Sequence, residues 1–182
     1  MRIFGFMYWK KKEAIVKTYL SWLSEVDWSH YLTLTFLRRQ SEEESQNRLK
    51  RFFHLLNCEV YGRRYRNHKG KKGLYYFATA EKQTTTQNTH FHLVLSFPNQ
   101  NEMVKAYREG EKTISKEMLR AFWKKAEGGI MRTDFFPTLQ EEREKVLAYC
   151  VKQFLEADEG LFFERLPAGL KGRKQDRKRE LN

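Results

Sequence analysis

The stretch His90-Phe91-His92-Leu93-Val94-Leu95-Ser96-Phe97 alternates in polarity and predicts a β-strand with two unlike faces. Successive side chains of a strand point to opposite faces of its sheet. One face here is apolar and is formed by Phe91, Leu93, Leu95 and Phe97. His90 and His92 share the other face, where two imidazoles at positions i and i+2 can bind one metal ion. Two polar residues on a half-exposed strand would give the same pattern.

A partner strand is expected just before this one. Residues 73–83 alternate in polarity and residues 84–89 are polar, which together indicate the first strand and the loop of a hairpin. If the polar side of the first strand shares the histidine face, Glu81 lies close to both rings. Two histidines and one carboxylate with open coordination positions suit Mn²⁺ or Mg²⁺ better than a closed zinc site. We therefore expect a metal site formed by His90, His92 and Glu81.

Composition places the chain among soluble, basic, single-domain proteins. It has 182 residues, 40% of them hydrophobic, which is enough for one core. Its formal net charge of +12 favours an anionic partner such as nucleic acid. Cys58 and Cys150 are the only two cysteines and have no metal-type spacing, which argues against a disulfide scaffold and favours a reducing cytosol. No segment resembles a secretory signal or a membrane span, so we expect no membrane partner and a cytoplasmic location.

Two segments concentrate positive charge. Residues 61–73 interleave six basic residues with two tyrosines, a composition that favours contact with nucleic acid over a merely solvated surface. The basic side chains expected to bind DNA there are Arg63, Arg64, Arg66, Lys69, Lys71 and Lys72. Residues 169–182 are basic with almost no hydrophobic residues, which predicts a flexible basic tail.

The remaining elements follow from periodicity and capping signals. Residues 31–36 alternate strictly and predict a strand whose polar face carries Tyr31, Thr33 and Thr35. Residues 13–26 predict an amphipathic helix with an aromatic side, and helices are expected to begin at Ser41 and Ser115. Gly128 and Gly129 close the latter helix, and residues 130–136 predict a further strand.

The last predicted helix spans residues 139–157. Its apolar stripe of Leu147, Val151 and Phe154 lies opposite Tyr149, which shares a polar face with Lys152 and Gln153. If this stripe packed on the sheet, Tyr149 would point away from the histidines. Either the stripe packs elsewhere, for example on the aromatic N-terminal helix, or the tyrosine serves another protomer.

The order of these elements predicts an α+β fold, a ferredoxin-like or RRM-like antiparallel sheet with packed helices. We expect a single domain over residues 1–168, with residues 1–30 as an N-terminal helical extension. The sequence contains no GxxxxGK[ST] phosphate-binding loop, which argues against an ATPase or helicase module.

Three short motifs together resemble those of the HUH endonucleases, in particular the single-tyrosine initiators of rolling-circle replication (Rep proteins). They are the strand motif at residues 31–36, the His90-Phe91-His92 motif, and Tyr149-Cys150-Val151-Lys152 in the pattern YxxK. The motifs occur in the family's order and span about two thirds of the chain. This resemblance implies the HUH nuclease variant of the ferredoxin-like fold.

The resemblance also implies roles for individual residues. His90 and His92 would hold a divalent ion, and Tyr149 would attack the DNA, leaving a 5′-phosphotyrosine and a free 3′-hydroxyl. Lys152 would stabilise the developing charge or assist deprotonation of the phenol. The third ligand is Glu81 by analogy with Rep proteins, or Gln153 by analogy with related small transposases. We favour Glu81 because a carboxylate suits a hard cation better than an amide.

The partner implied by this resemblance is single-stranded DNA at a replication origin, with Thr33 and Thr35 on the DNA-facing side. A host helicase and polymerase would act alongside the protein in the cytoplasm of a prokaryote that carries the plasmid or virus. The protein is expected to be a monomer or a dimer. Two alternatives are an HUH transposase with exchanged tyrosine helices and a non-catalytic RRM-like module. RRM sheets stack bases on aromatic residues, so a face carrying threonines and histidines favours metal chemistry.

Overall fold

The structure is a computed structural model that describes residues 3–65, 73–82, 89–97, 114–156 and 162–165. For residues 3–13, 82, 135, 153–156 and 162–165 it describes the backbone alone. The predicted hairpin loop, most of the basic segment 61–73 and the predicted basic tail lie outside the described residues.

A five-stranded sheet in the order β4-β1-β3-β2-β5 forms the centre of the described structure. All neighbouring strands in it are antiparallel. Its first four strands alternate with two helices along the chain: β1 (His30–Leu34), α2 (Glu42–Tyr61), β2 (Tyr75–Lys82), β3 (Thr89–Ser96), α4 (Lys116–Lys125) and β4 (Met131–Phe135). This connectivity with the strand order 4-1-3-2 is the ferredoxin-like arrangement, and the predicted α+β fold is confirmed.

The register of the three central strands agrees with the predicted faces. In the β2–β3 hairpin Thr79 pairs with His92 and Glu81 pairs with His90. On the other side of β3, Thr33 of β1 also pairs with His92. Directly paired residues of antiparallel strands share a face, so the polar residues of all three strands meet on one side of the sheet.

The fifth strand, β5 (Phe162–Arg165), was not predicted. It pairs with residues 76–79 of β2 and forms one edge of the sheet. Its sequence is Phe-Phe-Glu-Arg, and four residues are too few to show an alternating pattern.

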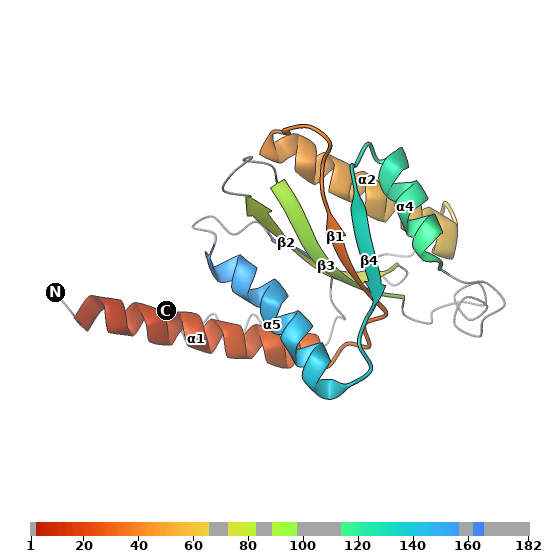
Figure 1. Ribbon diagram of the computed structural model, residues 1–182. Coiled ribbons are helices and arrows are strands. Elements are labelled where there is room, and N and C mark those ends of the chain that lie inside the picture. Colours follow the sequence, from red (N-terminus) through yellow and green to blue (C-terminus); the bar gives the residue numbers. More distant parts are fainter. Residues whose placement is uncertain (1–2, 66–72, 83–88, 98–113, 157–161, 166–182) are drawn as a thin grey trace.

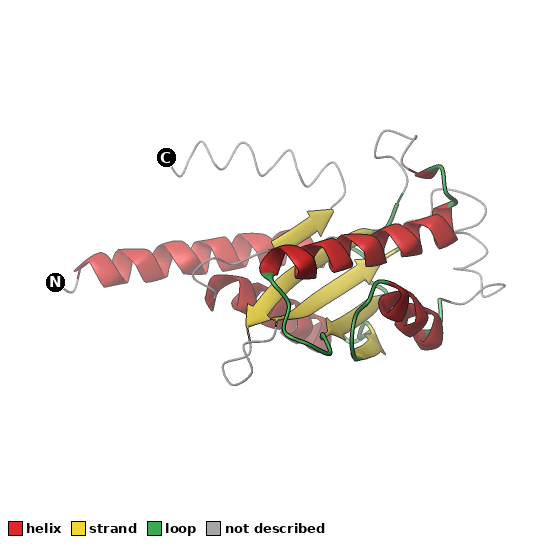
Figure 2. Ribbon diagram, turned by 90° about the horizontal axis from the view of Figure 1, so that it is seen from above, coloured by secondary structure: helices red, strands yellow, loops and turns green. Residues whose placement is uncertain are grey.

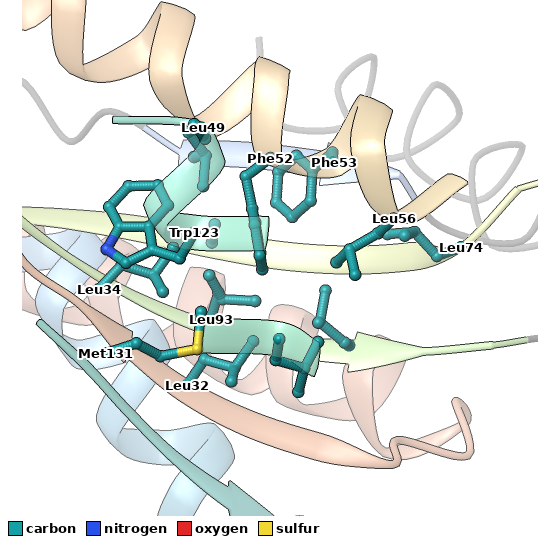
Figure 3. Packing of buried hydrophobic residues seen from close by; sticks show 14 of the residues in the cluster. Leu32, Leu34, Leu49, Phe52, Phe53, Leu56, Leu74, Leu93, Trp123 and Met131 are labelled. Carbon is teal, nitrogen blue, oxygen red and sulfur yellow. The ribbon is translucent and has the colours of Figure 1, made fainter. Parts of the chain in front are cut away.

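Helices α2 and α4 cover one face of the sheet (Figure 1; Figure 2 shows α2 crossing the strands). Their buried side chains and those of the strands form one apolar core, whose packing is shown in Figure 3. Its members include Leu32, Leu34 and Leu93 from the sheet, Leu49, Phe52 and Leu56 from α2, and Trp123 from α4. Leu93 belongs to the apolar strand face that the alternating pattern predicts, and Leu32 and Leu34 are the apolar residues of the alternating segment 31–36.

The starts of α2 and α4 were predicted correctly from their capping residues. Ser41 Oγ accepts from the backbone N–H of Glu44, and the Glu44 carboxylate accepts from the N–H of Ser41. Ser115 Oγ likewise accepts from the N–H of Met118. Each cap satisfies an N–H group that a helix end leaves without an intrahelical partner.

The opposite face of the sheet is covered by α1 (Ile3–Ser24) and α5 (Gln140–Glu156), which pack against each other (Figure 1). This second core combines Tyr19, Trp22 and Leu23 of α1 with Leu147, Cys150 and Val151 of α5 and with Phe77 and Val94 of the sheet. Helix α1 begins at Ile3, about ten residues before its predicted start. The prediction began too late because three consecutive lysines interrupt the apolar pattern. None of the described helices has the length and hydrophobicity needed to cross a membrane.

Candidate active site

His92 lies at the centre of the candidate site, on the face of β3 that carries α5. The residue is only 6% exposed. Nε2 of the imidazole lies 2.9 Å from Oε2 of Glu81 on β2. Nδ1 lies 3.2 Å from the hydroxyl of Tyr31 and 3.3 Å from Oγ1 of Thr33, both on β1. Both ring nitrogens of this buried histidine therefore have polar partners from the two neighbouring strands.

Burial lowers the pKa of His92, although the hydrogen bond with Glu81 acts in the opposite direction. A neutral imidazole carries a single N–H. When Nε2–H donates to the Glu81 carboxylate, Nδ1 accepts a hydrogen bond from Tyr31 or Thr33. When the proton moves to Nδ1, the same hydroxyls accept from it and Nε2 is left with a lone pair. That second tautomer places the Nε2 lone pair 2.9 Å from the Glu81 carboxylate, so it is favoured only when a cation lies between the two groups.

Tyr31 belongs to the site, and sequence reasoning gave it no role. Burial is the main cause that raises the pKa of Tyr31 to about 12, with smaller contributions from Cys150, Tyr149 and Glu81. Its hydroxyl therefore remains protonated near neutral pH and can donate to His92. The strict alternation of residues 31–36 already placed Tyr31 on the polar face, so the signal was present in the sequence.

Tyr149 lies over His92 at the border of the second core. The two rings meet edge to face, with centroids 5.0 Å apart and planes at 89°. Tyr149 is 41% exposed, whereas Cys150 and Val151, which follow it on α5, are fully buried. The prediction that Tyr149 lies off the apolar stripe of its helix agrees with this exposure.

This arrangement removes the conflict between the apolar stripe of α5 and the position of its tyrosine. The stripe packs partly on α1 and partly on Phe77 and Val94, which lie on the same sheet face as His92. Tyr149 sits at the flank of the stripe and reaches His92 within one chain. The stripe thus packs on the N-terminal helix, as the first predicted solution requires, but it packs on the sheet as well, so the expectation that sheet packing would turn Tyr149 away from the histidines was wrong.

The predicted metal ligands share one face but do not converge on one point. His90 is half-buried and pairs with Glu81 in the register, while the Glu81 carboxylate contacts His92. Within the described part of the chain, no group of three His, Cys, Asp or Glu side chains is gathered as a metal site. The donor types nevertheless fit a hard divalent cation, because a neutral imidazole and a carboxylate face each other, with hydroxyls behind the imidazole. The metal assignment stays a prediction.

The two other residues predicted near the tyrosine lie on α5. Lys152 is exposed and follows Tyr149 by three positions, so the two side chains lie on adjacent parts of the helix surface. Gln153, the alternative ligand, lies within α5, but its side chain is outside the described residues.

The residues predicted to bind DNA are divided between the two ends of the sheet. Thr33 lies in the site and contacts His92, whereas the Thr35 hydroxyl donates to the carbonyl of Ile130. Arg63 and Arg64 are exposed just after α2, near the start of β2. Six residues of extended strand separate Tyr75 from Glu81, about 20 Å. The remaining predicted contacts, Arg66, Lys69, Lys71 and Lys72, lie outside the described residues.

Comparisons with known proteins give one family and one structure. The family model described as replication-associated protein ORF2 matches residues 29–155, which are 127 of the 182 residues. No curated protein matches the chain. Among solved structures, the hypothetical protein ORF119 from Sulfolobus islandicus rod-shaped virus 1 is similar with a TM-score of 0.43 and 11% sequence identity. That match covers 78% of this chain and 91% of the viral protein.

Proposed function

The chain belongs to the family of replication-associated protein ORF2, and from this premise we propose that it is a single-tyrosine HUH endonuclease that initiates rolling-circle replication. It cuts single-stranded DNA at a replication origin and remains attached through a 5′-phosphotyrosine. The observation that carries this proposal is the contact of the partly exposed Tyr149 with His92, whose Nε2 meets the carboxylate of Glu81.

Tyr149 is the proposed nucleophile. Its phenolic oxygen forms a bond to phosphorus while the bond between phosphorus and the 3′ oxygen breaks. The phenol releases its proton and the 3′ oxygen takes one up, so the products are a 5′-phosphotyrosine and a free 3′-hydroxyl. Tyr31 is the other tyrosine beside His92, but burial and a pKa of about 12 make its phenolate much harder to form.

His92, Glu81 and His90 are the residues that would hold a divalent ion, Mn²⁺ or Mg²⁺. Such an ion would polarise the scissile phosphate and offset charge on its oxygens. Burial lowers the pKa of His92, which favours the neutral imidazole that a metal ion binds, and the Tyr31 and Thr33 hydroxyls lie against Nδ1. With the ion bound, a hydrogen-bonded Nδ1–H would fix the ring orientation and leave the Nε2 lone pair available to the ion.

Lys152 is proposed to act on the same phosphate group as Tyr149. It lies one helical turn from the tyrosine on the exposed side of α5. A positive charge there would stabilise the additional negative charge of the pentavalent transition state.

The geometry favours this proposal over the two alternatives. A transposase with exchanged tyrosine helices needs the tyrosine of one protomer at the histidines of another, whereas Tyr149 meets His92 within one chain. An RRM-like module needs an open sheet with aromatic residues for stacking, whereas α1 and α5 pack on that face. The host helicase, the polymerase and the prokaryotic cytoplasm remain part of the proposal.

The test uses the polarity of the cut. Wild-type protein is incubated with Mn²⁺ and a single-stranded oligonucleotide library labelled at either its 3′ or its 5′ end, then analysed on a denaturing gel. A 5′-phosphotyrosine keeps the 3′ label on the protein and releases the 5′ label with the 3′-hydroxyl fragment. Transfer of the 5′ label to protein, or no protein-bound label, would disprove the mechanism.

Tyr149→Phe is the decisive variant for this assay, with Tyr75→Phe as its matched control. Tyr75 lies half-buried on the same face at the far end of β2. Tyr149→Phe should abolish the protein-bound label, and Tyr75→Phe should retain it.

A further inference from the structure

Two large apolar side chains stand exposed at the end of the sheet nearest the candidate site. Leu37, just after β1, is 78% exposed, and Ile130, just before β4, is 64% exposed. Thr35 holds the two segments together, because its N–H and its hydroxyl both donate to the carbonyl of Ile130, at 3.0 and 2.9 Å. The two segments that carry these exposed side chains are therefore adjacent.

The backbone beneath these side chains is closely braced. The carbonyl of Thr35 accepts from the N–H of Gly129 at 2.8 Å and from the indole N–H of the buried Trp123 at 3.2 Å. A Cβ added at Gly129 would lie 2.7 Å from the backbone nitrogen of Leu37, so a glycine is needed for this approach. This hydrogen-bonded backbone keeps the side chains of Leu37 and Ile130 exposed to water, where apolar surface is unfavourable. Single exposed aliphatic residues are common, but two of them on adjacent, hydrogen-bonded segments mark a candidate binding surface.

This surface continues the sheet face of the candidate site. Thr33 pairs with His92 on one side and with Arg132 on the other, which places Arg132 about 10 Å from His92 across two strand spacings. Ile130 precedes Arg132 by two residues and belongs to the same face. Figure 1 shows α5 running from the end of β4 toward β2, away from the start of β4 and the end of β1.

Three arginines flank the apolar pair. Arg38 and Arg39 follow Leu37, Arg132 follows Ile130, and all three are exposed. Among the described residues, none of the three has an ion-pair partner, whereas Arg48 and Arg51 on α2 both contact Glu127. Unpaired guanidinium groups around an apolar pair match a ligand that carries phosphates and flat apolar surfaces together.

We propose that Leu37 and Ile130, with Arg38, Arg39 and Arg132, bind the single-stranded DNA that flanks the scissile phosphate. The aliphatic side chains contact unstacked bases and the arginines bind the adjacent phosphates. This inference rests on the proposed function, because it assumes that single-stranded DNA is the substrate. A second copy of the chain is a poorer occupant, since a symmetric contact would bring the unpaired arginines of both copies together.

The test measures binding without cleavage, in a Tyr149→Phe background. Anisotropy of a fluorescein-labelled oligothymidylate is recorded over a series of KCl concentrations. The double variant Leu37→Ser/Ile130→Ser should weaken DNA binding about tenfold, because two partly covered aliphatic side chains together contribute about as much as one that is fully buried. The salt dependence of the binding constant should not change. Glutamine at positions 38, 39 and 132 should instead flatten the slope by about 0.7 for each phosphate that is no longer bound.

Leu139→Ser is the matched control, because Leu139 is 64% exposed like Ile130 but lies at the start of α5. It should bind DNA like its parent, and thermal melting should show that all variants fold. Equal binding by the Leu37→Ser/Ile130→Ser protein and this control would overturn the proposal. A change of oligomeric state in light scattering without a change in DNA affinity would overturn it as well.

Failure of the proposed function gives a different result. If the serine variant loses DNA affinity as expected but wild-type protein forms no covalent adduct, the binding surface is supported and the nicking activity is contradicted. If wild-type protein forms the adduct and the serine variant binds DNA like the control, the nicking activity is supported and the binding surface is contradicted.

Discussion

The two faces of the sheet differ in chemistry although the same strands build them. On β3 the side chains of Phe91, Leu93 and Leu95 enter a large, mainly apolar core beneath α2 and α4. On the other face Val94 joins the aromatic core with α1 and α5, while His92 lies in a hydrogen-bonded network. The first face is mainly apolar, although the buried His30 and Thr133 also lie on it, whereas the second face divides between packing and a polar site.

This difference indicates how the fold supports a candidate active site. Because the apolar face contributes the larger core, we expect it to stabilise the register that places Thr33 and Glu81 around His92. Each ring nitrogen of His92 has a partner on a neighbouring strand, which offsets the cost of burying the imidazole.

The largest loss of stability is expected on the apolar face. Phe52→Ala should lower the free energy of unfolding by about 3–5 kcal/mol, because the side chain is fully buried against Trp123 and leaves a cavity. Urea denaturation followed by circular dichroism measures this loss. A loss below about 1 kcal/mol would show that this face is not the main support of the sheet.

A smaller loss should separate the two histidines. His92→Ala should cost about 1–3 kcal/mol, because it removes a buried group that Glu81, Tyr31 and Thr33 contact. His90→Ala should stay within about 0.5 kcal/mol, since the side chain is half-exposed. The same denaturation experiment compares them, and equal losses would contradict the central position of His92.

The hydroxyls behind His92 should influence metal affinity. Tyr31→Phe combined with Thr33→Val should weaken Mn²⁺ binding about 10- to 100-fold, because neither hydroxyl then orients Nδ1. Tyr31→Phe alone should weaken Mn²⁺ binding less, since the Thr33 hydroxyl still contacts Nδ1. Electron paramagnetic resonance of free Mn²⁺ reports the binding, with Tyr75→Phe as control. Unchanged affinity in the double variant would remove the orienting role.

The smallest effect concerns the cap of the helix that supports the apolar face. Ser41→Ala should lower the free energy of unfolding by about 1 kcal/mol, because the hydrogen bond from the Glu44 N–H to the serine hydroxyl is removed. DNA binding should not change. Denaturation and anisotropy together test this, and a loss of DNA affinity at constant stability would connect α2 to the substrate.

Much of the fold could be predicted from the sequence because local patterns determine it. Alternation on β1 and β3 separated the two faces, and the capping serines marked the starts of α2 and α4. The four-residue β5 carries too little pattern, and three lysines hid the start of α1. Such elements depend on what they pair with or pack against rather than on their own periodicity.

The site was predictable in its residue types but not in its contacts. Periodicity placed Tyr31, Thr33 and His92 on polar faces, yet only the register between strands shows that the two hydroxyls meet the imidazole. The basic segment after α2 is close to the site in sequence, but the length of β2 separates Arg63 and Arg64 from it. The surface around Leu37 and Ile130 was not predicted, because Leu37 carries no periodic signal and Ile130 was assigned to the predicted strand 130–136.

The most direct test of the account identifies the amino acid that carries the DNA. Wild-type protein that has reacted with single-stranded DNA is digested with nuclease and trypsin, and its peptides are analysed by mass spectrometry. Trypsin cleavage after Lys145 and Lys152 gives residues 146–152, in which Tyr149 is the only tyrosine. We predict a 5′-phosphonucleotide on this peptide. The same modification on the peptide that contains Tyr31, with residues 146–152 unmodified, would contradict the assignment of Tyr149 as the nucleophile.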